Sequence, residues 1–322
     1  MTTDNDKTGG LVRGSTMRRT AAVLAAAGVL SVGVAACGGG KSKSTAGKPG
    51  AGKPAVTLGA KNFPEEFILG QLYTQALRAK GYKVTLKNNI GTSEITYKAL
   101  TSGKIDAYPE YTGEIISTLF GKNNRPSTAE QAYAQAKQLV GTQGLTLTQK
   151  TPFFDRDVLA VLTSYAQKNG LKQTGDLKKL GAKVTYGAPP ESRTRYQGLI
   201  GLRQAYGLTK MKFKPLAIGL QYQALDAGQI QTGDVFTTDG QLVGGKYVLL
   251  ADPKNIFGFQ NVAMIVNKKV LAREGADFAT TVDAVSAKLT NDAVQKMNAA
   301  VVIDKNSPAD VAKKFLQANG LI

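Results

Sequence analysis

The sequence contains no histidine, and its only cysteine is Cys37. Without these residues no Ser-His-Asp or Cys-His relay can be built, and neither can a thiolate or imidazole zinc site. A lone cysteine also excludes an internal disulfide, so the fold must be held together by packing alone. These absences argue against hydrolytic and metal-dependent chemistry, and we expect neither a cofactor nor a bound metal.

Acidic residues are few relative to basic ones, and the net charge is +18. Such an excess is typical of proteins that bind nucleic acid or an anionic membrane surface. The lysines are scattered through amphipathic segments such as 176–180, and no nucleic-acid-binding motif is present. We therefore interpret the charge as a solvated surface attracted to anionic lipid headgroups, and we expect no nucleic-acid partner.

The N-terminal segment indicates export. Two arginines, Arg18 and Arg19, precede an apolar stretch at 21–36 that ends in small residues. This pattern is typical of a secretory signal, and the stretch is shorter than the about 20 residues of a membrane span. Residues 31–37 resemble the lipobox of bacterial lipoproteins. The resemblance implies that 1–36 is a signal peptide and that Cys37 becomes the lipidated N-terminus at the outer face of the cell membrane.

Residues 38–54 consist almost entirely of Gly, Ser, Lys, Ala and Pro. This composition cannot bury a core, so we expect 37–54 to be a lipidated cysteine with a flexible tether.

From residue 56 onward, strand and helix signals alternate. Strands are predicted at 56–60, 82–86 and 105–108, with helices at 64–80 and 93–101 between them. This rhythm predicts an α/β unit with a mainly parallel sheet covered by helices. It restarts with strands at 158–162, 183–186, 211–213 and 230–236 and helices at 192–206 and 219–227, and 268–318 is predicted to be helical.

A weak internal repeat links the two parts. Residues 97–106 match 222–231, and each segment is a helix end, a glycine and a strand. We therefore expect two lobes joined by crossing segments near 149–154 and 257–261. Lobe I would comprise 55–151 and 260–322, and lobe II would comprise 152–259. Strand ends and helix N-termini would face the cleft between them.

Three segments resemble one known family. They are 59–70, the Lys-to-Gly run at 98–113 that contains Tyr-Pro-Glu-Tyr-Thr-Gly, and the Thr-Thr-Asp-Gly run at 237–240. They look like glycine betaine/choline-binding proteins, the ProX/OpuC-type substrate-binding lipoproteins of osmoprotectant ABC importers. The resemblance implies a two-lobed type II periplasmic-binding-protein fold and a monomeric receptor, not an enzyme. This receptor would capture glycine betaine, choline or a related quaternary amine and deliver it to an ABC permease.

The resemblance also implies site residues. A trimethylammonium group has no N–H to donate and is held by aromatic faces through cation–π attraction, whereas a ligand carboxylate is held by Lys or Arg. Lys61 and Tyr111 match family positions in the first lobe. Glu191 and Arg195 match a pair that approaches the ligand carboxylate and bridges the lobes. The three other cage positions fall on Val158, Phe236 and Gln260.

Several positions depart from the family pattern. Val158 and Gln260 replace two cage tyrosines, which removes about 1–4 kcal/mol of cation attraction. Glu114 stands where the family usually has threonine. Together with Asp155 and Asp157, Glu114 could compensate by charge and favour a cation over a zwitterion. The alternative is that the same scaffold binds a different polar or aromatic solute.

Plainer interpretations compete at each position. Lys61 alone would be a solvated lysine, Glu191 and Arg195 a surface pair four residues apart, and Phe236 part of the core. Residues 155–157 would be a solvated turn. An enzyme using Glu65, Glu66 and Glu110 is a further hypothesis. Nothing in the sequence activates these carboxylates, and we expect the two at the helix start to stabilise its N-terminus.

Overall fold

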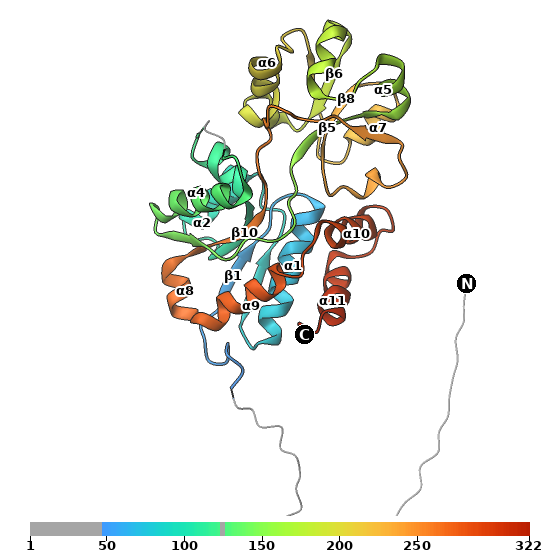
Figure 1. Cartoon of the computed structure of the whole chain (residues 1–322). Coiled ribbons are helices and arrows are strands. Elements are labelled where there is room, and N and C mark those ends of the chain that lie inside the picture. The colour runs from blue at the N-terminus through green and yellow to red at the C-terminus, as the bar shows by residue number, and fades with distance from the viewer. Residues whose placement is uncertain (1–46, 123–125) are drawn as a thin grey trace, which may run out of the picture. The chain divides into compact units, whose positions relative to one another are not determined.

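Two five-stranded sheets organise the residues that the computed structural model describes, which are 47–122 and 126–322 (Figure 1). The first sheet has the order β2-β1-β3-β10-β4. Its strands are β1 (Val56–Gly59), β2 (Val84–Lys87), β3 (Ala107–Tyr111), β4 (Leu145–Leu147) and β10 (Val262–Asn267). The second sheet has the order β7-β6-β8-β5-β9. Its strands are β5 (Asp157–Leu162), β6 (Thr185–Ala188), β7 (Lys212–Pro215), β8 (Thr232–Phe236) and β9 (Tyr247–Leu249).

The two sheets have the same topology, and both are mixed. In the first, β1 pairs in parallel with β2 and β3, while β10 pairs antiparallel with β3 and β4. In the second, β6 pairs in parallel with β7 and β8, while β5 pairs antiparallel with β8 and β9. The predicted α/β class with two helix-flanked sheets is confirmed. The sheets are less parallel than expected because β5 and β10 enter from the opposite lobe and run against their neighbours.

Helices surround each sheet, and we call each sheet with its helices a lobe. The first lobe contains α1 (Pro64–Ala79), α2 (Ser93–Thr101), α3 (Thr112–Glu114), the π-helical turn η1 (Ile115–Leu119), α4 (Ala129–Gly141), α8 (Lys268–Glu274), α9 (Ala276–Ser286), α10 (Asn291–Val302) and α11 (Pro308–Ala318). The second contains α5 (Thr163–Asn169), the 3-10 segment η2 (Thr174–Lys183), the 3-10 turn η3 (Pro190–Arg193), the π-helical turn η4 (Tyr196–Ile200), α6 (Gly201–Tyr206), α7 (Gln221–Asp226) and the 3-10 turn η5 (Gly240–Leu242).

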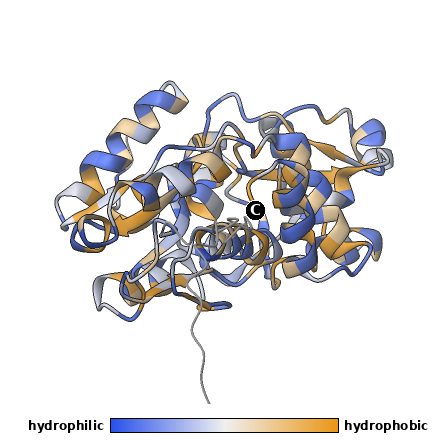
Figure 2. Ribbon diagram, turned by 90° about the horizontal axis from the view of Figure 1, so that it is seen from below, coloured by the Kyte–Doolittle hydropathy of each residue, from blue (hydrophilic) through white to orange (hydrophobic). Residues whose placement is uncertain are grey.

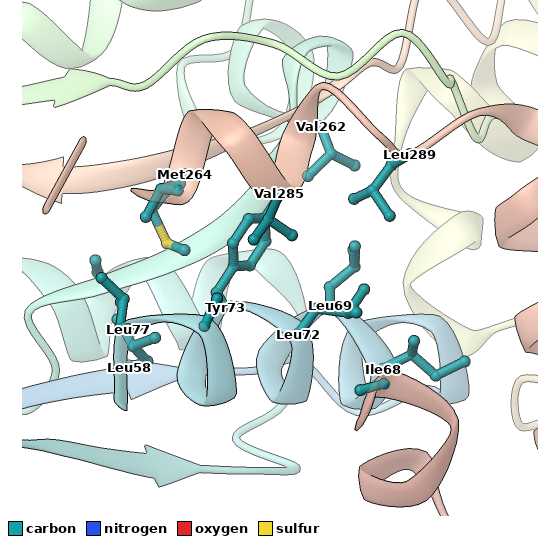
Figure 3. Close-up of a cluster of buried hydrophobic side chains, with 14 of the residues drawn as sticks. Leu58, Ile68, Leu69, Leu72, Tyr73, Leu77, Val262, Met264, Val285 and Leu289 are labelled. Atoms are coloured by element: carbon teal, nitrogen blue, oxygen red, sulfur yellow. The ribbon is translucent and has the colours of Figure 1, made fainter. Parts of the chain in front are cut away.

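Helix α1 is the centre of the first lobe. Pro64 begins it with a fixed φ, and the buried Glu65 and Glu66 lie in its first turn. Its apolar face packs against α9, α10 and α11. Figure 3 shows the resulting core, in which Leu72 and Tyr73 of α1 meet side chains of β10 and α9. Figure 2 shows hydrophobic colour concentrated along the strands and hydrophilic colour along the outer faces of the helices.

The repeat at 97–106 and 222–231 occupies equivalent places in the two lobes. One copy runs from α2 to β3 and the other from α7 to β8. Gly103 and Gly228 both adopt positive φ, at 73° and 65°, at the point where the helix ends and the chain turns toward the strand. The glycine is needed in both copies because other residues strain at such φ values.

Two chain segments connect the lobes, one between β4 and β5 and the other between β9 and β10 (Figure 1). They lie side by side, because Phe154 and Asn261 form an antiparallel bridge. The Asn261 amide donates to the carbonyls of Thr151 and Phe153 at 3.1 and 3.0 Å. The crossings are therefore tied to each other at the base of the space between the lobes.

The predicted signal peptide and Cys37 lie outside the described residues, and the predicted tether extends too far. Residues 48–54 contact the first lobe: Gly50 N donates to Lys80 O at 3.0 Å, and Lys53 Nζ donates to Arg273 O at 3.0 Å. A Cβ on Gly50 would lie 2.3 Å from Tyr82 N, so only glycine allows this close approach. In residues 47–122 and 126–322, every helix is too short or too polar to span a bilayer.

Candidate ligand-binding site

A cavity of about 60 Å³ lies between the lobes. It forms where strands of both sheets end: β1 and β3 deliver the first lobe's side chains, and β6 and β8 deliver those of the second. Its lining residues are Lys61, Asn62, Phe63, Thr92, Ser93, Tyr111, Glu114, Asp155, Asp157, Pro189, Glu191, Ser192, Arg195, Ile218, Phe236 and Gln260. A cavity needs roughly 10–15 Å³ to hold one water molecule. A cavity of this size therefore has room for a small solute.

Three aromatic rings form one wall of the cavity. Phe63 lies between the other two, with ring centroids 6.2 Å from Tyr111 and 5.6 Å from Phe236. The interplanar angles are 28° and 14°, so the rings are stacked. Phe236 belongs to the second lobe, and the stack therefore forms only when the lobes are together. Such a wall offers π surfaces to a cation.

Lys61 is buried, with 3% of its surface exposed, so it is not the solvated lysine of the plainer interpretation. Its ammonium lies 4.3 Å from the Tyr111 ring centroid, forms an ion pair with Glu110, and contacts Ser93 Oγ at 3.3 Å. Burial lowers the pKa of Lys61, but the charges of Glu110 and Glu66 outweigh burial and raise it overall. Lys61 therefore stays charged, with its donors already directed at protein acceptors.

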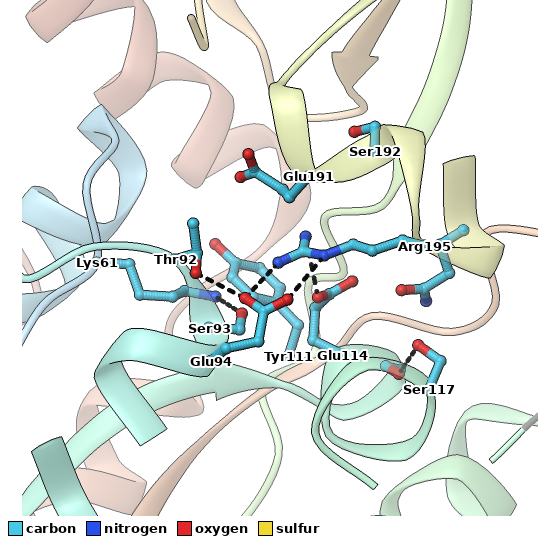
Figure 4. Close-up of polar contacts among 12 residues, drawn as sticks. Lys61, Thr92, Ser93, Glu94, Tyr111, Glu114, Ser117, Glu191, Ser192 and Arg195 are labelled. Atoms are coloured by element: carbon cyan, nitrogen blue, oxygen red, sulfur yellow. Dashed lines mark hydrogen bonds and ion pairs between the residues drawn. The ribbon is translucent and has the colours of Figure 1, made fainter. Parts of the chain in front are cut away.

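Arg195 bridges the lobes (Figure 4). Its Nη2 lies 2.7 Å from Glu94 Oε2, and its Nε donates to Glu94 Oε1 at 3.3 Å. Its Nη1 lies 3.5 Å from Glu114 Oε2. Both glutamates belong to the first lobe, so one guanidinium on the second lobe holds two carboxylates across the cleft. Glu191 has no ion-pair partner among the described residues, and the Glu191–Arg195 surface pair of the plainer interpretation is absent there.

The local backbone explains how Arg195 reaches across. A helix was predicted over 192–206, but the chain forms η3, then an extended Arg195 with φ −84° and ψ 147°, and only then η4 and α6. A Cβ on Gly198 would lie 2.2 Å from Ser192 O, so glycine is required for this fold-back. The break directs Arg195 toward the cleft instead of along a helix surface.

The acidic crossing segment is not a solvated turn. Asp155 is buried, and its Oδ1 accepts from Thr238 N at 3.1 Å and from Thr237 Oγ1 at 3.2 Å. Asp157 lies at the start of β5, directly opposite Phe236 in the sheet. It has no ion-pair partner within the described part of the chain. Burial, reinforced by the charges of Asp234 and Glu114, raises the pKa of Asp157 well above its ordinary value.

A second set of contacts joins the lobes behind the aromatic wall. Glu65 Oε1 accepts from Tyr111 Oη at 2.6 Å. Its other oxygen accepts from Thr238 Oγ1 at 2.5 Å and from Asn298 Nδ2 at 2.9 Å. Burial raises the pKa of Glu65 despite these donors. This network fixes the Tyr111 ring and connects α1 and α10 to the second lobe.

The buried carboxyls predict an unusual dependence of stability on pH. Burial is the first cause in each case and raises the pKa of Glu66 to about 8, that of Asp234 to about 7 and that of Asp239 to about 6. The folded chain therefore binds more protons than the unfolded chain between about pH 4 and 8, and its free energy of unfolding falls as the pH rises through this range. We expect a difference of about 1 kcal/mol or more between pH 5.5 and 8.0 in urea denaturation.

Few other side chains obscure this effect, because the sequence has no histidine. Asp239→Asn should flatten the profile, whereas Asp226→Asn, at an acid whose pKa is lowered chiefly by its hydrogen bond from Lys246, should not. A stability that rises between pH 5.5 and 8.0 would contradict the burial of these carboxyls.

Comparisons with known proteins agree with this geometry. Residues 54–318 match the family described as the substrate binding domain of ABC-type glycine betaine transport system. A glycine-betaine-binding protein of Pseudomonas aeruginosa is 32% identical over 276 residues, which cover 82% of this chain and 88% of the relative. The chain belongs to this family of ABC transporter substrate-binding domains. Family members are extracytoplasmic and bind small solutes for an ABC transporter.

Two further comparisons support the family and the fold. Glycine betaine-binding protein YehZ of Escherichia coli is 28% identical over 279 residues, covering 82% of this chain and 90% of the relative. A crystal structure titled glycine betaine/carnitine/choline ABC transporter superposes with a TM-score of 0.68 at 22% identity, covering 83% of this chain and 99% of the other. The two-lobed type II binding-protein fold is therefore confirmed.

Eight of the nine predicted ligand-binding residues of this family member line the cavity: Lys61, Tyr111, Glu114, Asp157, Glu191, Arg195, Phe236 and Gln260. The exception is Val158, whose side chain packs in the core of the second lobe with Tyr222 and Val235. Successive residues of a strand face opposite sides, so Asp157 faces the cavity and Val158 cannot. Gln260 lines the cavity and accepts from Glu114 N at 3.1 Å.

Two important residues were missed. Phe63 lies within the segment that carries the family resemblance, but none of the cage positions that the resemblance implies falls on it. Glu94 was missed because it lies on α2, in the other lobe, 101 positions before Arg195. An aromatic residue between β1 and α1, where a strand end faces the cleft, was the available signal for Phe63. No local signal indicates the pairing of Glu94.

Proposed function

We propose that the chain is an exported lipoprotein, anchored through Cys37 to the outer face of the cell membrane, that captures glycine betaine, choline or a related quaternary amine. It acts as a monomer, delivers the solute to an ABC permease and catalyses no reaction. The observation that carries this proposal is the cavity between the lobes, where three stacked rings stand beside Asp157 and Glu191, two acids without an ion pair among the residues that the structure describes.

The chemistry of the cavity suits a quaternary ammonium group. Such a group cannot donate a hydrogen bond, so its attraction comes from ring faces and from negative charge, and each cation–π contact contributes about 0.5–2 kcal/mol. Tyr111, Phe63 and Phe236 supply the rings. Asp157 and Glu191 supply carboxylates without ion pairs among the described residues, and a bound cation would compensate them.

The lobes supply a way to enclose the solute. Contacts across the cleft, such as Arg195 with Glu94 and Thr238 with Glu65, form only when the lobes meet. Hinge closure around a ligand is a common mechanism in two-lobed binding proteins, and the paired crossings provide the hinge. One chain is thus expected to bind one ligand.

The names of the relatives support the same class of solute. The two relatives compared above are named for glycine betaine, and the superposed structure is titled for glycine betaine, carnitine and choline. These names do not favour the alternative, an unrelated polar or aromatic solute. The apolar stretch before Cys37 supports export and anchoring.

Isothermal titration calorimetry of the purified protein with choline, glycine betaine, carnitine and proline betaine tests the proposal. We expect at least one of them to bind at a stoichiometry of one per chain and to be recovered unchanged. The matched neutral ligand is 3,3-dimethylbutan-1-ol, which has the shape of choline without its charge and should bind far more weakly. Absence of heat with all four amines, or turnover of any of them, would refute the proposal.

Anchoring has its own test. Expressed in a bacterium that processes lipoproteins, the chain should incorporate radiolabelled palmitate, and Cys37→Ser should abolish the label. Retention of the label in Cys37→Ser would contradict lipidation at this residue.

A further inference from the structure

A second cavity, of about 50 Å³, lies between the lobes behind the aromatic wall. It shares Phe63 and Phe236 with the ligand cavity, so the two cavities are neighbours. Its walls come from α1 and α10 of the first lobe, from the crossing segment before β5, and from residues that follow β8 in the second lobe. Its polar lining consists of Glu65, Asp155, Thr238, Asp239, Gln241 and Asn298.

The charge on this second cavity is negative. Three acids line it, and no lysine or arginine of the described chain does. The three acids lie close together, because the charges of Glu65 and Asp239, added to burial, raise the pKa of Asp155 well above its ordinary value. In the part of the chain that the structure describes, no three acids converge closely enough to hold a metal ion by themselves. Neutral oxygens would have to complete any cation site.

Protein donors satisfy only part of the two aspartates. Asp155 Oδ1 accepts from Thr238 N at 3.1 Å, but Asp155 Oδ2 accepts from no described residue. Asp239 Oδ2 accepts from Phe236 N at 3.0 Å and from Tyr222 Oη at 2.8 Å. Asp239 Oδ1 likewise has no donor among the residues described. Each aspartate therefore keeps one oxygen for a further partner.

Two amide oxygens complete the set of acceptors. Asn298 is only 4% exposed, and its buried Oδ1 has no hydrogen-bond partner among the described residues. Its Nδ2 donates to Glu65 Oε2 at 2.9 Å and to Thr238 O at 3.1 Å, so Oδ1 is the atom that remains for an occupant. Gln241 Oε1 is buried and unpartnered in the same way. Buried acceptors of this kind need a donor or a cation.

We propose that the second cavity binds an alkali-metal cation, sodium or potassium. Its ligands are the free oxygens of Asp155, Asp239, Gln241 and Asn298. Hard cations prefer oxygen ligands, and carboxylates together with amide oxygens are such a set. Water alone would satisfy the amide oxygens but would leave the buried carboxylate charges uncompensated. A water molecule needs roughly 10–15 Å³, so the cavity has room for the ion and bound water.

The ligands come from both lobes. Asn298 belongs to α10 of the first lobe, whereas Asp239 precedes η5 of the second lobe and Gln241 lies within it. Helix α10 and η5 are in contact. A cation held by both lobes favours their closed arrangement, so it should raise the affinity for a solute bound between them, and the solute should raise the affinity for the cation. This coupling rests on the proposed function, whereas the cation site itself does not.

Sodium NMR tests the site without any solute. At pH 8, exchange with the cavity should broaden the sodium resonance in the presence of the wild type, and added potassium chloride should narrow it again. Gln241→Met keeps the length of the side chain and removes the unpartnered Oε1, so it should abolish the broadening. Gln167→Met is the matched control, at an exposed glutamine of α5 in the second lobe, and it should broaden the resonance as the wild type does.

Calorimetry with choline and glycine betaine tests the coupling. We expect each amine that binds the wild type to bind about fivefold or more tightly in sodium or potassium chloride than in N-methyl-D-glucamine chloride of the same ionic strength. Gln167→Met should keep this difference. In Gln241→Met the affinities in the two salts should be equal. Asp239→Asn, which removes one of the carboxylates, should reduce the difference in the same direction.

The outcomes are distinguishable. A sodium resonance that the wild type does not broaden, or that Gln241→Met broadens equally, would mean that the cavity holds only water and would overturn the cation site. Displacement of sodium by calcium or magnesium at far lower concentrations than by potassium would overturn the assignment to a monovalent ion. Sodium binding with equal amine affinities in both salts would overturn the coupling. If no quaternary amine binds, the proposed function fails, while the sodium resonance still decides whether the cation site exists.

Discussion

Asp157→Asn should weaken choline binding about 30-fold and, at the same time, stabilise the ligand-free protein. Asp157 pairs with Phe236 across β5 and β8, both residues line the cavity, and Asp157 has no ion-pair partner among the described residues. Removing a charge that contacts a bound cation in a partly desolvated site costs about 2 kcal/mol of binding, which corresponds to this factor. Without the cation the same charge destabilises the folded protein, because burial and the neighbouring acids disfavour the ionised form and raise the pKa of Asp157.

Calorimetry with choline and urea denaturation at pH 8 measure the two effects on the same sample. Asp226→Asn is the matched control: Asp226 is another aspartate of the second lobe, but it pairs with Lys246 outside the cavity. This control should leave choline binding unchanged. If Asp157→Asn bound choline as the wild type does, the quaternary amine would not lie beside β5. If the variant were less stable than the wild type, other groups of the ligand-free protein would already compensate the negative charge of Asp157.

Gly240→Ala should lower choline affinity about 10- to 100-fold without a comparable loss of stability. Gly240 begins η5 in the second lobe and packs on α10 of the first lobe. A Cβ at this position would lie 2.6 Å from Ala299 Cα and 2.8 Å from Ala299 Cβ. Overpacking of this kind costs about 1–3 kcal/mol, and the lobes can relieve it by opening. The closed state then becomes rarer, and the apparent affinity falls in proportion.

Gly141→Ala, on the helix α4 where a Cβ has no neighbour within 4 Å, is the matched control and should bind choline normally. Small-angle scattering should show that choline compacts the wild type and Gly141→Ala more than Gly240→Ala. Equal losses of affinity and of thermal stability in Gly240→Ala would indicate a core defect instead of impaired closure. Unchanged affinity would show that the Gly240–Ala299 contact is absent from the ligand-bound state.

Local sequence signals located many of the elements accurately. The helix at 93–101 was predicted with the bounds that α2 has, because its start and its stop at Gly103 are both marked in the sequence. Strands β4, β9 and β10 were missed. Residues 262–266 form a short apolar run without alternation, as expected for a strand buried on both faces. Periodicity does not distinguish such a strand from a segment of a buried helix. The helix predicted over 192–206 is interrupted by the extended Arg195 and by the non-helical backbone of Gly198.

The site was predictable only where a motif carried it. Lys61 follows β1, and Tyr111 is the last residue of β3. Both lie in sequence runs that resemble the family, and this resemblance placed them at the cleft. Asp155 looked like a solvated turn because polarity along the chain does not show that the opposite lobe covers it. The cage position assigned to Val158 differs by one residue from Asp157, which lines the cavity. In a strand this shift of one residue moves a side chain from the cavity to the core. The partners of Arg195 lie far away in sequence, and only the folded chain brings them together.

A crystal structure of the protein with choline tests the central claim most directly. We predict that the quaternary nitrogen lies between the lobes, within about 6 Å of the ring centroids of the aromatic wall and nearest to Asp157 among the acids, while Arg195 keeps its ion pairs with Glu94 and Glu114. Choline bound on an outer face of either lobe, or a cavity that stays empty at saturating choline, would contradict the account.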